Sequence, residues 1–361
     1  TASFGQVGAS GDVAYSGTGR FIAERYIPTG TAGSQHSKSW QFLAVPTNGG
    51  QTINQAWQEG AAVANQNPKP GYGTMLTSPI TPLPATFDAY TSAGPSIKSY
   101  VSATNSWAGP PNTTSQALFD KRGYMVFVRG DRSVITYNGT PVPTILRNRG
   151  KLFVPGSNPP QTTTIAAGSF ETLGNPYACA IDFLNISRPA SPAVDDVYYV
   201  WDPLLPGSNS FGLGGYQTIS AVNGYKPSPG GTINYSNASA YTKIQSGQAF
   251  FMHATGAGGT VTFTEAAKIA GSQQVYRPAP ASPVSRSFIR TELSVLSGTD
   301  TRLMDAAVRE FAPEVVVLPG PGNPLGSITA QILIAEGWRG MRSRAEFEVV
   351  QGSAAPVIVS M

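Results

Sequence analysis

The acidic residues are the first candidates for chemistry, because cleavage of a glycosidic bond needs two carboxyl groups on opposite sides of that bond. Asp195 with Asp196, or Asp182 with Asp202, would form such a pair. Because only 20 of the 361 residues are acidic, these would be the candidate pairs whatever the function of the chain. The segment ASPAVDDVYYV is more typical of a polar turn that leads into a strand. The sequence therefore predicts that the chain is not an enzyme, with a fragment of a polysaccharide-active enzyme as the alternative.

Nucleophiles and metal ligands are equally scarce. The single cysteine, Cys179, excludes an internal disulfide, and the two histidines, His36 and His253, exclude a dense Cys/His metal site. No D-x-D-x-D-G series marks a calcium loop, although calcium held by other loop carboxylates stays open. The glycine loop 319–326 lacks the Lys-Ser/Thr of a P-loop, which favours a structural turn over a phosphate cradle. We expect no cofactor and no metal site.

Arg129, Gly130 and Asp131 spell RGD, a tripeptide that some cell-adhesion receptors recognise. A second segment with the same pattern carries HATGAGG at this place, so the shared requirement is glycine in a turn rather than a receptor code. Such a short motif also arises by chance. We expect a hairpin turn after a buried strand, with an adhesion motif as the alternative.

The elements that position these residues are strands. YMVFVR (124–129) and AFFMHA (249–254) are almost wholly apolar or β-favouring, as in strands that are buried on both faces. SVITYNG (133–139) and GTVTFTE (259–265) follow them and alternate polar with apolar residues, which predicts a half-exposed return strand. Each segment therefore predicts a β-hairpin.

An internal repeat organises the chain. SKSWQFLAVPTNGGQTINQAW resembles AGSFETLGNPYACAIDFLNI, and KRGYMVFVRGDRSVITYNG resembles QSGQAFFMHATGAGGTVTFTE, in the same order and with similar separation. The matched pairs are Trp40 with Phe170, Phe42 with Thr172, Pro46 with Pro176, Gly123 with Gly247, Phe127 with Phe251, Val128 with Met252 and Arg129 with His253. We predict two tandem, related β-sandwich-like units, 1–160 and 161–283, followed by a short α/β tail, 284–361.

Composition favours an exported, mainly β protein. Only 12% of the residues are charged, while 40 glycines and 30 prolines indicate many turns. The net charge of +4 is spread along the chain without runs of Lys or Arg, which argues against nucleic acid and anionic membranes as partners. An apolar run long enough to cross a membrane is missing, and the start at Thr1 predicts an internal piece of a longer polypeptide.

Long Pro/Gly/Asn loops such as 65–84 and 203–216 are where binding usually resides. The aromatic residues in or near such loops that are predicted to stack on sugar rings are Trp107, Trp201, Tyr216 and Tyr225. Aromatic side chains in β proteins more often lie in the core or in cross-strand pairs. Core packing is therefore the preferred interpretation, and a glycan platform is the second.

Five ordered segments carry a family resemblance: SWQFLAVPTNGGQTINQAWQEG, GYMVFVRGDRS, LGNPYACAIDF, VYYVWDP and IQSGQAFFMHATG. Together they resemble the repeated segments of large Bacteroidota surface proteins that are exported by the type IX secretion route, over about residues 15–283. Such segments follow adhesin-like or polysaccharide-related modules and have no assigned enzymatic chemistry. The resemblance implies a non-enzymatic structural or binding module, secreted or on the outer cell surface, with adhesion or glycan binding as its role.

The last part of the chain has a different pattern. DTRLMDAAVREFA carries Met304, Val308 and Phe311 at helical spacing behind Asp300, which predicts a helix, and EVVVL and SITAQILIAEGW predict a strand and a second helix. PEVVVLPGPGNPLG and ILIAEGWRGMRS resemble the C-terminal end of an acyl-carrier-protein acyltransferase. The serine elbow G-x-S-x-G is missing and both histidines come earlier. We therefore expect an inactive remnant, joined by a fusion of unrelated reading frames.

Overall fold

The structure, a computed structural model, is mainly β, as the composition predicts. The chain divides into two compact units, Thr1–Tyr276 and Arg277–Met361. The structure describes residues 4–8, 10–18, 20–30, 37–78, 87–89, 94–118, 122–136, 138–157, 159–160, 162–189, 194–203, 205, 214–229, 241–270, 287–297, 300–311, 345–347 and 357–359.

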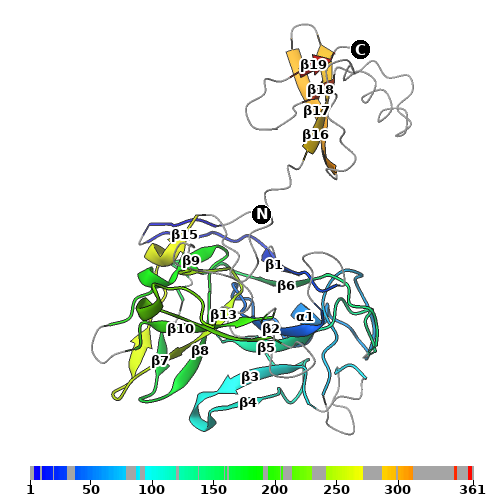
Figure 1. The fold of residues 1–361 in the computed structure, drawn as a ribbon. Helices are drawn as coiled ribbons and strands as arrows, with labels where there is room; N and C mark the ends of the chain where they lie inside the picture. Colours follow the sequence, from blue (N-terminus) through cyan, green and yellow to red (C-terminus); the bar gives the residue numbers. More distant parts are fainter. Residues whose placement is uncertain are drawn as a thin grey trace. The chain divides into compact units, whose positions relative to one another are not determined.

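A four-stranded antiparallel sheet forms from the first half of the unit Thr1–Tyr276 (Figure 1). Its strands, in spatial order, are β2 (Ser39–Leu43), β5 (Tyr124–Val128), β3 (Ile97–Val101) and β4 (Ser106–Ala108). Side chains alternate between the two faces of a sheet. One face accordingly carries Leu43 and Val126 into an apolar core, while Phe42 points to the opposite face and belongs to a different cluster.

A second four-stranded antiparallel sheet forms from the second half. Its strands, in spatial order, are β8 (Phe170–Gly174), β13 (Ala249–His253), β10 (Val197–Asp202) and β11 (Gly215–Ser220). If the four strands of each sheet are numbered by their order in the chain, both sheets have the spatial order 1, 4, 2, 3. Strands β5 and β13 confirm the two buried strands that the sequence predicts.

The two sheets pair their first and last strands differently from what the sequence matches require, and the difference is two residues. Trp40 lies opposite Phe127 across β2 and β5, whereas Phe170 lies opposite His253, not Phe251, across β8 and β13. The match of Trp40 with Phe170 and the match of Phe127 with Phe251 therefore cannot both hold. A shift of two residues keeps each side chain on the same face of its sheet, so the two patterns of buried positions still agree.

Three apolar clusters lie among the described residues of the unit Thr1–Tyr276. Two of them cover the faces of the two sheets that point away from each other, and the third lies between the sheets. The cluster between them, called the intersheet cluster below, contains Phe42, Ala44, Tyr100, Met125, Ala249 and Phe251, with Trp40, Trp107, Phe170, Tyr199, Trp201 and Tyr216 packed against it. The ring of Phe251 lies 4.7 Å from that of Tyr100 and 5.2 Å from that of Phe42. Aromatic contacts therefore join the two sheets face to face.

Further strands and helices complete the unit Thr1–Tyr276. The remaining strands pair as β1 (Phe21–Ile27) with β6 (Thr144–Gly150), β7 (Thr163–Ile165) with β14 (Gly259–Val261), and β9 (Ala180–Asp182) with both β12 (Lys243–Ile244) and β15 (Lys268–Ile269). The helices are α1 (Ile53–Trp57) and the 3₁₀ turns η1 (Ser102–Thr104), η2 (Phe183–Asn185), η3 (Ala221–Asn223) and η4 (Glu265–Ala267). In the described part of the chain, no helix is long and apolar enough to cross a membrane.

The two predicted hairpins are wrong. After β5 the chain enters turns rather than a return strand, and β14 pairs with β7 rather than with β13. Gly130 shows the physical reason in the first case. It adopts φ +141°, and a Cβ atom there would lie 2.8 Å from the carbonyl oxygen of Val142, so the chain folds tightly against residue 142 instead of running back along β5.

The unit Arg277–Met361 contains strands in its described residues: β16 (Ser287–Ser297) pairs with β17 (Asp300–Phe311), and β18 (Ala345–Phe347) with β19 (Val357–Val359). The predicted helix behind Asp300 is therefore wrong, because these residues pair with β16 along their length and such pairing overrides local helix propensity. The predictions for 314–338, including the glycine loop 319–326, lie outside the described residues, as does His36.

We expect Phe251→Ala to lower the free energy of unfolding by about 3–5 kcal/mol, because it opens a cavity where the two sheets meet. Urea unfolding of the full chain measures this change. Val222→Ala is the control, because Val222 is 93% exposed, and its effect should stay below about 0.5 kcal/mol. Equal stability of the two variants would contradict a packing role for the intersheet cluster.

Candidate functional site

Three of the four aromatic residues that the sequence offers for sugar stacking lie together in the intersheet cluster. Trp201 and Tyr216 pack edge to face with ring centroids 4.9 Å apart. Trp107 and Tyr216 lie 5.6 and 5.7 Å from the ring of Phe251. Burial, with a smaller contribution from the nearby Tyr100, raises the pKa of Tyr216 above its usual range. These rings contact one another, as core packing requires.

The fourth of these residues, Tyr225, lies apart from the other three. Its hydroxyl donates to Oδ2 of Asp196 over 2.6 Å, and Nη2 of Arg188 lies 3.0 Å from Oδ1 of the same carboxylate. The guanidinium of Arg188 stacks over the ring of Phe183 at 4.1 Å. Burial first, and then the hydrogen bond to Asp196, raise the pKa of Tyr225 to about 12. Tyr225 thus belongs to a polar contact that anchors the chain around η2 and η3.

The carboxylates proposed as a glycosidase pair are engaged in structural contacts. Asp182 caps the short helix η2, and Asp202, only 2% exposed, accepts a hydrogen bond of 3.1 Å from the side-chain amide of Gln217. Asp195 lies 2.6 Å from Nδ1 of His253. A general acid and base must reach a substrate, whereas each of these carboxylates already contacts a group of its own chain.

The RGD tripeptide forms part of a tight, largely buried turn. Arg129 and Asp131 are each only 6% exposed. One carboxylate oxygen of Asp131 accepts from the backbone N–H of Gly71 over 2.7 Å, and the other accepts from the backbone N–H of Ser133 over 2.9 Å. The geometry therefore supports the turn rather than a tripeptide displayed to a receptor.

The residue after this tripeptide, Arg132, forms a buried ion pair with Asp88, and both side chains are 0% exposed. The guanidinium donates from Nη2 to Oδ1 over 2.7 Å and from Nη1 to Oδ2 over 2.9 Å. Asp88 also accepts from the side chain of Gln58 and from the backbone N–H groups of Leu76 and Asn65. The pair ties the long loop between α1 and β3 to the turn after β5, a contact that local sequence patterns do not reveal.

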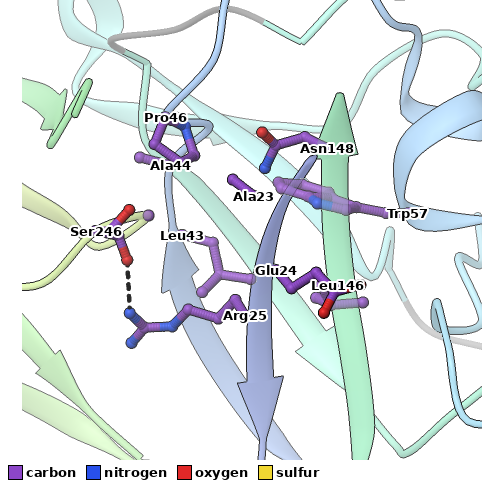
Figure 2. A pocket seen from close by; sticks show the side chains of 11 residues that line it. Ala23, Glu24, Arg25, Leu43, Ala44, Pro46, Trp57, Leu146, Asn148 and Ser246 are labelled. Atoms are coloured by element: carbon purple, nitrogen blue, oxygen red, sulfur yellow. Dashed lines mark hydrogen bonds between the residues drawn. The ribbon is translucent and has the colours of Figure 1, made fainter. Parts of the chain in front are cut away.

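A small hollow lies where the two halves of the unit meet (Figure 2). Its volume is about 20 Å³, and β1, β2, α1, β6 and the turn before β13 line it. Two of its polar side chains are already engaged: Nη1 of Arg25 donates to the carbonyl oxygen of Ser246 over 2.9 Å, and Oδ1 of Asn148 accepts from the hydroxyl of Thr47 over 2.7 Å. The hollow is therefore a gap left where the two halves pack together rather than a ligand pocket.

The first sheet also carries a group of side chains that the sequence reasoning missed. Trp40 and Phe127 are partly exposed, Lys98 lies over the ring of Trp40 and Arg129 over that of Phe127. Lys38 lies close enough to Arg129 to feel its charge. Lys38 comes just before β2 and Arg129 just after β5, each two residues from the aromatic residue of its strand. That period-two pairing of a cation with an aromatic residue is the signal that would have found them. We call these five residues the basic aromatic cluster.

Comparison with known proteins places the chain in a family without an assigned activity. A family model described as a domain of unknown function (DUF8693) matches residues 71–297, which is more than half of the chain. Neither the curated proteins nor the solved structures gave a match. The matched region includes β3, β4 and β5 of the first sheet and the whole of the second sheet.

Asp131→Ala should lower the free energy of unfolding by about 1–3 kcal/mol, because the N–H groups of Gly71 and Ser133 lose their acceptor. Thermal or urea unfolding measures the effect. Asp131→Glu should leave the attachment of integrin-bearing cells to the immobilised chain unchanged. If Asp131→Glu abolished attachment while stability was retained, the tripeptide would be an adhesion motif after all.

Asp88→Asn should cost about 3–5 kcal/mol of stability, because Arg132 would stay buried without a compensating charge. Denaturant unfolding of the full chain tests this. Asp12→Asn changes an exposed carboxylate and serves as the control, with unfolding close to that of the unmodified chain. Coincident unfolding curves for the two variants would show that the buried pair does not hold the loop.

Proposed function

The chain belongs to DUF8693, a family of domains of unknown function, and we propose that the unit Thr1–Tyr276 is a non-enzymatic binding module of a secreted or cell-surface bacterial protein, with glycans as its partners. The observation that carries the proposal is the intersheet cluster, which joins two sheets into one compact body. Long connections between the strands, such as the one between α1 and β3, are the usual place for recognition on a β scaffold.

An internal duplication is part of this proposal. The two sheets share one strand order, and each half contacts the other at the start of its last strand. The backbone N–H of Ala44 donates to the carbonyl oxygen of Gly247 over 2.9 Å, and the backbone N–H of Gly123 donates to the hydroxyl of Thr172 over 3.4 Å. Both contacts link the segment just before the last strand of one half, β5 or β13, to the first strand of the other half or the residue after it.

The engagement of the acidic side chains also supports a non-catalytic role. Asp182, Asp195, Asp196 and Asp202 each hold a neighbouring group of the same chain. Freeing one of them for catalysis would break a structural contact, and Asp202 would also have to leave a buried site. The resemblance to exported surface proteins, together with the low charge content and many turns, favours a location outside the cell.

Full-length chain should be retained by at least one polysaccharide in a panel of bacterial and algal glycans and should release no reducing ends from any of them. Affinity electrophoresis measures retention, and a reducing-sugar assay measures cleavage. Asp196→Asn should leave retention unchanged, because the carboxylate serves Arg188 and Tyr225. Release of reducing ends that Asp196→Asn abolished would favour the enzyme-fragment alternative, and no retention by any glycan would contradict the binding role.

A further inference from the structure

Strand β1 pairs with β6 in a two-stranded antiparallel sheet, and among the described residues β6 is its only partner strand (Figure 1). The backbone of Ile145 in β6 faces away from β1. Its N–H donates to the carbonyl oxygen of Gly71 over 3.0 Å, and its carbonyl oxygen accepts from the N–H of Gly73 over 2.9 Å. Residues directly opposite each other in an antiparallel pair exchange either both hydrogen bonds or none. Tyr26, which lies opposite Ile145, therefore exchanges none with β6.

The same alternation applies to Ile22 and Glu24, because bonded and non-bonded pairs alternate along an antiparallel ladder. Arg149, which lies opposite Ile22, agrees with this alternation, since its N–H donates to the side chain of Gln51 and not to β1. The N–H and carbonyl groups of Ile22, Glu24 and Tyr26 thus point to the outer edge of β1. Within the described part of the chain, no hydrogen bond reaches them there.

Three other edge strands of the unit are covered or short. Thr218 of β11 exchanges hydrogen bonds of 2.8 and 3.0 Å with Ser228, and the N–H of Ala44, just after β2, donates to Gly247. Strand β4 has three residues, whereas β1 has seven. Strand β1 also lacks the proline, lysine or bulge that often protects an edge. An open edge of this kind is a template for a strand of another chain.

The side chains of Ile22, Glu24 and Tyr26 lie on one face of β1, because they are two residues apart. Ile22 and Tyr26 are each 55% exposed, and Glu24 is exposed as well. Glu24 lies opposite Arg147, close enough to affect its pKa, but the guanidinium of Arg147 donates from Nε and Nη2 to Glu59. The open edge therefore presents an acidic side chain between two apolar ones.

We propose that β1 is a docking edge for an extended segment of another protein, which adds to it as an antiparallel strand. Such a segment would place Lys or Arg opposite Glu24 and apolar side chains opposite Ile22 and Tyr26, since pairs of these kinds stabilise neighbouring strands. A second copy of β1 fits less well, because antiparallel pairing centred on Glu24 would place two carboxylates opposite each other. This interaction surface goes beyond glycan binding and does not depend on it.

The test is a titration of the full chain with two fluorescein-labelled peptides, TVTKTVT and TVTETVT, which differ only in the residue that would lie opposite Glu24. Fluorescence anisotropy gives the dissociation constants. We expect the lysine peptide to bind at least about fivefold more tightly than the glutamate peptide, because opposite charges attract across a strand pair and like charges repel. Glu24→Lys should reverse this order.

Asp12→Lys is the matched control, because it makes the same change of charge at an exposed residue outside β1, and it should leave the order of the two peptides unaltered. Equal affinities for the two peptides, no binding of either, or the same reversal in Asp12→Lys would overturn the inference. Sedimentation of the chain alone tests the second copy. A dimer that Ile22→Pro dissociates, through loss of an N–H on the open edge, would show that a copy of the chain takes this edge and would overturn the proposed partner.

Hydrogen exchange locates the bound peptide. In the free chain the N–H groups of Ala23 and Arg25 should exchange slowly, because they bond to β6, whereas those of Ile22, Glu24 and Tyr26 should exchange fast. The lysine peptide should slow the exchange of these three N–H groups at least about tenfold. Unchanged exchange there with the peptide bound would place the peptide elsewhere and overturn the inference.

Discussion

Both four-stranded sheets are apolar on both faces, and the architecture of the unit Thr1–Tyr276 follows from that constraint. In the second sheet, Phe250 and Met252 enter one core while Phe251 enters the intersheet cluster. A sheet of this kind cannot leave either face in water without losing the free energy of apolar burial, about 25 cal/mol per Å². Each half covers one face of its own sheet with its other elements, which in the first half are β1, β6 and α1, and the two remaining faces cover each other.

Loops that lack an apolar core of their own are held by polar contacts instead. The pair of Asp88 and Arg132 is the strongest example, because both charges are removed from water and their hydrogen bonds are satisfied by neighbours such as Gln58. Replacing both members of a buried ion pair by apolar residues often leaves stability unchanged or raises it. The hydrogen bonds of the pair, however, are satisfied in only one arrangement of the surrounding groups. In a chain rich in glycine and proline, such contacts fix which conformation a long loop adopts.

Composition and local patterns predicted the mainly β class and strands β5 and β13, because an apolar run bounded by glycine indicates a buried strand whatever its partners are. They failed on the partners themselves. Nothing in the sequence around Val134 shows that the segment after β5 turns away, or that β14 joins β7. The residues from Asp300 to Phe311 have helical spacing but form a strand with β16. Lys98 and Trp40 lie far apart in the sequence, so their contact depends on the order β2, β5, β3.

The way in which the two sheets share the intersheet cluster also limits how this protein can evolve. A half-chain separated from the other would expose an aromatic face that includes Phe42 and Tyr100, or Phe251 in the other half, and such a face promotes aggregation. Recombination can therefore move the pair of halves between larger proteins, but not one half alone. Loop positions outside the contacts of Asp88, Arg132 and Asp131 can change sequence, whereas substitutions at the shared aromatic positions must be matched across the two halves. The heritable module is the pair of halves, although each half has a sheet and a core of its own.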